Sequence, residues 1–114
     1  MVNVEEILVE HLNGAGLGCE AFMDVPANRP ELFVTVERTG GGHDTFRDMP
    51  QVVVQAWARS RWEASELADD VAAALWLARF HPRIARVTVG SISNFPDLDS
   101  GQARYQIFAS LVTK

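Results

Sequence analysis

A segment in the middle of the chain constrains the fold most, because an apolar strand runs directly into a capped helix there. The apolar run predicts a strand over residues 51–58. Ser60 and Glu63 then have the spacing of a capping box, in which each side chain satisfies a free amide of the first helical turn. Pro82 removes a backbone donor and ends the helix. We therefore expect a helix over residues 61–80.

This helix has two faces that are not typical of solvent-exposed surface. At about 100° per residue, one face is a stripe of small and branched apolar residues, which predicts a core face: Ala64, Leu67, Ala68, Val71, Leu75 and Ala78. The opposite face mixes aromatic and acidic residues: Trp62, Glu66, Asp69, Ala73, Trp76, Leu77 and Phe80. Either Trp76 and Phe80 pack under a loop of the same chain, or they contact a partner. The acids between the rings favour the partner, because interfaces place aromatic anchors inside a polar rim.

The other elements follow from the same kind of pattern. Asn3 and Glu6 have N-capping spacing before a first helix, and glycines follow its end. A glycine-rich loop covers residues 39–49, and the last two strands are expected to form an antiparallel pair. The predicted elements are a helix over 2–13, strands over 19–25, 32–38 and 51–58, the helix over 61–80, and strands over 84–92 and 104–112. This order predicts a single α+β domain over residues 1–114, with a four- or five-stranded, largely antiparallel or mixed sheet and two helices packed on one face.

Composition excludes several classes of protein. A chain of 114 residues with 47% hydrophobic and 22% charged residues is long enough for one globular core. The net charge of −5 argues against a nucleic-acid-binding protein, whose affinity comes from clustered Lys and Arg. No apolar run reaches the ~20 residues of a membrane-spanning helix, and the N-terminus lacks the pattern of a signal peptide. Cys19 is the single cysteine, so no internal disulfide is expected.

The sequence signals for chemical sites are weak. The glycine triplet Gly40–Gly42 lacks the lysine of a phosphate-binding loop. The segment Asp97–Gly101 resembles the start of a calcium loop, but it lacks the closing glutamate, so a turn is expected. His11, His43 and His81 do not have the spacing of metal ligands. We expect no catalytic residues, no metal and no cofactor, and hence no enzyme.

Several segments together resemble one known family. They are Val52–Ala58 running into Ser60–Ala68, then Phe95–Asp97, and finally Gly101–Gln106 opening the last strand. In these segments, and in its length and element order, the chain resembles the tail terminator (tail completion or minor tail) proteins of long-tailed bacteriophages. The resemblance covers nearly the whole chain.

The resemblance implies a structural virion protein at the tail–neck junction, assembled in the host cytoplasm. Such a protein is expected to form a ring, typically a hexamer, that caps the tail tube, stops its growth and offers a surface to the head. The implied partners are further copies of the chain, the tail tube protein and the head–tail connector protein. DNA would pass through the lumen without sequence-specific contact, and no membrane is involved.

Two groups of residues are candidates for these contacts. The expected subunit interface comprises Trp62, Glu66, Asp69, Trp76, Leu77 and Phe80. The expected loop for the tube or connector comprises Gly40, Gly41, Gly42, His43, Phe46 and Arg47. Two alternatives remain open: a head-closure or connector adaptor of the neck, and a small soluble binding domain or hydrolase that uses the loop around His43.

Overall fold

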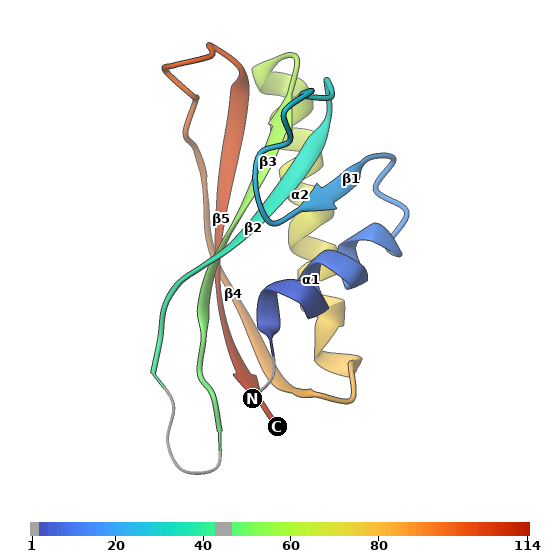
Figure 1. Ribbon diagram of the computed structural model, residues 1–114, viewed down its shortest axis with the longest axis vertical. Coiled ribbons are helices and arrows are strands. Elements are labelled where there is room, and N and C mark those ends of the chain that lie inside the picture. Colours follow the sequence, from blue (N-terminus) through green and yellow to red (C-terminus); the bar gives the residue numbers. More distant parts are fainter. Residues whose placement is uncertain (1–2, 43–46) are drawn as a thin grey trace.

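The computed structural model describes residues 3–42 and 47–114, and it has the predicted order of elements. One five-stranded sheet carries both helices on the same face (Figure 1). The strand order is β1-β2-β3-β5-β4, with β1 and β2 parallel and the other neighbours antiparallel. This is the predicted α+β architecture. The elements are α1 (Val4–Asn13), β1 (Glu20–Phe22), β2 (Phe33–Gly40), β3 (Gln51–Ala58), α2 (Arg61–Leu77), the 3₁₀ turn η1 (Ala78–Phe80), β4 (Ile84–Asn94) and β5 (Ala103–Thr113).

Both helices begin at the predicted caps. The Asn3 side chain accepts a hydrogen bond from the Glu6 amide at 3.1 Å, and the Ser60 hydroxyl accepts one from the Glu63 amide at 3.2 Å. The Glu63 carboxylate forms an ion pair with Arg59 at 2.7 Å. The α-helical part of α2 ends at Leu77, three residues earlier than predicted, and η1 continues it to Phe80. Helix ends commonly tighten into 3₁₀ turns in this way.

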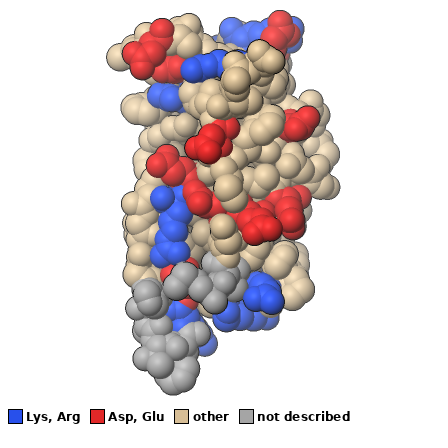
Figure 2. All heavy atoms as spheres, in the orientation of Figure 1, with Lys and Arg blue, Asp and Glu red and all other residues tan. Residues whose placement is uncertain are grey.

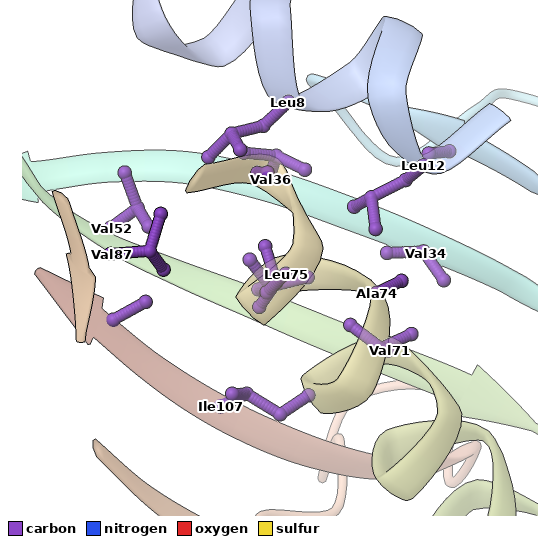
Figure 3. Packing of buried hydrophobic residues seen from close by; sticks show 14 of the residues in the cluster. Leu8, Leu12, Val34, Val36, Val52, Val71, Ala74, Leu75, Val87 and Ile107 are labelled. Carbon is purple, nitrogen blue, oxygen red and sulfur yellow. The ribbon is translucent and has the colours of Figure 1, made fainter. Parts of the chain in front are cut away.

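The main core lies between the sheet and the two helices (Figure 3). Alternate residues of the strands point to the helices, because successive side chains of a strand face opposite sides. The predicted apolar stripe of α2 is buried in full. It packs with Leu8 and Leu12 of α1 and with the apolar face of the sheet, which includes Val34, Val36, Val52, Val54, Ala56, Val87, Ile107, Ala109 and Leu111.

A second, smaller core lies on the opposite face of the sheet. The periodicity of β2 predicts one buried side, with Val34 and Val36, and one mixed side, with Phe33, Thr35 and Glu37. On the mixed side Phe33 and Thr35 are buried and Glu37 is exposed. The Phe33 ring stacks on Trp57 of β3, with 5.1 Å between ring centroids. The Trp57 indole N–H donates to the Thr35 hydroxyl at 3.1 Å. We call this group, with the residues that cover it, the Trp57 cluster: Phe22, Arg29, Phe33, Thr35, Trp57 and Arg104.

Strand β1 is shorter than the predicted strand over residues 19–25. Gly18 adopts a φ of 79° in the turn just before it, and Pro26 interrupts the segment that follows. The side-chain amide of Asn13 holds the outer edge of the strand, because it accepts from the Ala21 amide at 2.8 Å and donates to the Ala21 carbonyl at 3.3 Å. The β1 edge of the sheet is therefore closed at Ala21.

Candidate interaction surfaces

The outer side of α2 is exposed, as the sequence predicts. The exposed fractions are 70% for Trp62, 48% for Trp76, 51% for Leu77 and 71% for Phe80. Glu66 and Asp69 are exposed on the same helix. Side chains exposed to this extent are not packed under a loop, so the structure does not support the intrachain interpretation of Trp76 and Phe80. The subunit interface at these residues stays a prediction.

The structure divides this surface into two parts. Trp62 and Trp76 are fourteen positions apart in sequence, which corresponds to about 21 Å along a helix axis. At the Trp76 end, the Arg79 guanidinium lies 4.3 Å from the centroid of the Trp76 ring and 4.2 Å from the centroid of the Phe80 ring. The same side chain donates to the Trp76 carbonyl at 3.1 Å. We call Trp76, Leu77, Arg79 and Phe80 the α2-end cluster.

Arg79 was not among the predicted interface residues. Cation–π contacts of this kind orient a guanidinium over aromatic rings. Arg79 follows Trp76 by three positions and directly precedes Phe80. This spacing is a sequence signal, but the periodicity of apolar residues alone does not detect it. The α2-end cluster is therefore a basic aromatic surface, whereas the surface around Glu66 and Asp69 is acidic.

A groove of about 630 Å³ runs beside the α2-end cluster, between α2 and β4. Its lining is mainly apolar and comprises Ala72, Trp76, Arg86, Val87, Thr88 and Val89. Strand β4 is at the edge of the sheet, so its outer side pairs with no strand among the described residues. This groove has no signal in the sequence, because strand order depends on how distant segments pair.

The hairpin of β2 and β3 extends beyond the body of the molecule as an arm (Figure 1). Arg38 and Asp48 join its two sides through a bidentate pair, with N–O distances of 2.6 and 2.9 Å. The Arg38 guanidinium also donates to the carbonyl groups of Gly40 and Gly41 at 3.1 Å each. The hydrogen bond to Asp48 raises the pKa of Arg38 above its ordinary value. The base of the arm is thus held by charge-assisted hydrogen bonds.

The described part of the predicted contact loop lies on this arm. Gly40 pairs with Gln51, and the Gly42 carbonyl accepts from the Met49 amide at 2.8 Å. Gly41 has a φ of 89°, a conformation that L side chains rarely adopt. Arg47 is exposed. The predicted residues His43 and Phe46 lie outside the described residues.

The described residues include no group of metal ligands and no membrane-spanning helix. Within residues 3–42 and 47–114, no three His, Cys, Asp or Glu side chains are grouped so that they could hold a metal ion. Partial burial raises the pKa of the Cys19 thiol, so the neutral thiol dominates at neutral pH. In this same part of the chain no helix has the length and apolar character needed to cross a membrane.

The segment that resembles a calcium loop is a turn. The Asp97 carboxylate accepts from the Ser100 hydroxyl at 2.6 Å and pairs with Arg29 at 3.4 Å. The Ser100 hydroxyl, followed by the Asp99 amide and Arg29, lowers the pKa of Asp97 below its ordinary value. Gly101 has a φ of 75° in this turn. The Asp97 side chain thus holds the turn and the loop that contains Arg29 together.

Comparison with known proteins shows the fold and no family. The chain matches no protein-family model and no curated protein sequence. Its fold is similar to that of a chain in a solved structure described as the virion of a native gene transfer agent (GTA) particle. The TM-score is 0.61, and the match covers 94% of this chain and 84% of that chain. Sequence identity is 14%, so the likeness concerns the fold alone.

Proposed function

We propose that this chain is a structural protein of a virion, and that it forms a ring that caps the tail tube. In this role the ring stops growth of the tube and gives the head connector a surface to bind. The observation that carries the proposal is the exposed aromatic surface of α2 on a fold that a GTA virion chain also has. The resemblance of the sequence to tail terminator proteins adds the specific place in the particle.

The exposed surface of α2 supports self-association. Large apolar side chains grouped on the surface of a soluble chain commonly mark contact sites, and tryptophan is enriched among residues that dominate binding energy. A ring needs a heterologous contact, in which one surface of a subunit meets a different surface of the next and the rotation closes. In our proposal Trp62, Trp76 and Phe80 contribute to that contact, and the arm formed by β2 and β3 reaches toward the tube or the connector.

A charge placed in the α2-end cluster tests the ring. Trp76→Glu removes an anchor and puts a carboxylate in its place, so we expect folded subunits that do not assemble. Ser110→Glu adds the same charge at an exposed position of β5, outside α2, and serves as the matched control. Far-UV circular dichroism checks folding, and native mass spectrometry with negative-stain microscopy checks assembly. Normal rings from Trp76→Glu would contradict the role of this surface.

A stop codon early in the gene tests the place of the ring in the particle. We expect overlong tails without heads, because nothing then ends growth of the tube. Tails of normal length that do not join heads would instead indicate a connector adaptor. Particles that are normal and infectious would exclude both structural roles. Electron microscopy of lysates distinguishes the three outcomes.

A further inference from the structure

The two edges of the sheet differ in charge. Residues 71–96, which run from the last two turns of α2 through β4, contain three arginines and no Asp or Glu, whereas the four acidic residues of α2 all lie in its first ten positions. Residues 5–37, which include α1, β1 and most of β2, contain seven Asp or Glu and one arginine. Figure 2 shows acidic side chains gathered over α1 and β1, with basic side chains below them near the chain ends. Because β1 and β4 are at opposite ends of the strand order, a basic edge and an acidic edge face away from each other.

The basic edge contains the groove between α2 and β4. Trp76 is half exposed on one side of it, and Arg86 is exposed on the other. Half-buried Val89 gives the lining apolar surface, whereas the side chain of Val87 is 3% exposed and belongs to the main core. Arg86 is the charged residue of this lining, and the rest is mainly apolar, so the groove suits a short apolar segment with a negative charge placed on the β4 side, away from Asp69 of α2.

A segment of that kind follows β1 on the acidic edge. Met23 and Val25 are 41% and 39% exposed, and the exposed Asp24 lies between them. The Asn13 side chain forms hydrogen bonds with the amide and the carbonyl group of Ala21, so these groups are not available to pair with another strand. Contacts of this edge with a neighbouring copy would therefore be made by side chains. A methionine side chain is flexible and makes favourable contacts with aromatic rings.

We propose that Met23–Val25 of one copy docks in the groove between α2 and β4 of the next copy, with Asp24 beside Arg86. This inference rests on the proposed ring and supplies its second surface. The docked segment and the groove are on opposite edges of the sheet, so each copy has one of each free for a further neighbour. The contact is therefore heterologous, as a closed ring requires.

A charge exchange tests the contact. Asp24→Arg and Arg86→Asp each place like charges together, and we expect each to weaken ring assembly by about tenfold or more. The chain with both substitutions restores the pair in reversed order and is expected to assemble within about threefold of the unchanged chain. Asp99→Arg makes the same change of charge at an exposed position in the turn between β4 and β5 and serves as the control.

Two assays read the result on the full chain. Native mass spectrometry measures the ring in solution, and complementation of the stop-codon strain measures tail length and infectious titre where assembly occurs only on the tube. Single variants that assemble and complement normally, or a double variant that does not recover, would overturn this contact. If the charge-exchange variants assembled normally but Trp76→Glu blocked rings, the proposed function would stand without the contact of Met23–Val25. Normal tails in the stop-codon strain would instead overturn the proposed function itself, and assembly that stops at two copies would overturn the heterologous contact.

Discussion

Removal of Trp57 tests whether the second face of the sheet is a true core. Trp57 is 2% exposed, stacks on Phe33 and donates to Thr35. A buried aromatic side chain removes about 150–250 Å² from water, and at about 25 cal/mol per Å² this corresponds to roughly 4–6 kcal/mol. An unfolded chain that is already partly compact lowers that figure by roughly 10–40%. We therefore expect Trp57→Ala to lower the free energy of unfolding by about 3–5 kcal/mol, as large-to-small core substitutions do.

Trp62→Ala is the matched control, because the same substitution there removes an indole that is 70% exposed. We expect it to change the stability of the monomer by no more than about 0.5 kcal/mol. Trp57→Phe keeps a ring in the stack but loses the hydrogen bond to Thr35, and we expect a cost of about 1–2 kcal/mol. Urea unfolding followed by far-UV circular dichroism measures all three, at a protein concentration at which the chain is monomeric. Equal costs for Trp57→Ala and Trp62→Ala would refute the second core.

Three further predictions concern the arm and the turn. Gly41→Ala places a methyl group against the Met49 carbonyl oxygen at a positive φ, and we expect a loss of about 2 kcal/mol or more in urea unfolding; an unchanged midpoint would contradict the geometry of the arm. Asp48→Ala leaves the Arg38 guanidinium without the Asp48 carboxylate, and the Asp48 side chain is 9% exposed. We expect the free energy of unfolding to fall by about 2–3 kcal/mol. Asp48→Asn should be less destabilising, because it keeps one acceptor. The pKa of Asp97 is lowered in the folded state, first by the Ser100 hydroxyl, so its contribution to stability is present above the unfolded pKa and is lost as the pH falls through the folded pKa. Carboxyl NMR titration should show Asp97 below the usual range and Ser100→Ala moving it upward; an Asp97 pKa at or above the ordinary value would rule this out.

The caps and the core stripe of α2 were predictable because their determinants are local. Ser60 and Glu63 are one helical turn apart, and the buried stripe repeats at the helical period, so neighbours in sequence fix both. The exposure of Trp62, Trp76 and Phe80 follows from the same period, because a helix that buries one stripe turns the opposite one outward. For that reason the candidate surface on α2 could be named from the sequence.

The Trp57 cluster was not predictable, because its members come from five separate segments. Arg29 lies in the loop before β2 and Arg104 begins β5, yet both guanidinium groups lie over the Trp57 ring, at 5.3 and 4.7 Å from its centroid. No pattern along the chain indicates that charged side chains cover an aromatic one. Side-chain burial on this face depends on contacts between residues far apart in sequence.

The sequence by itself determined the type and order of the elements, the caps, and the two faces of α2, because each depends on residues within one or two turns. Only the tertiary structure decided that β5 inserts between β3 and β4. That pairing makes β4 an edge strand and places it beside Trp76 to form a groove. It also separates the acidic β1 edge from the basic β4 edge. The physical reason is that sheet order is set by hydrogen bonds and packing between distant segments, for which a local pattern carries no information.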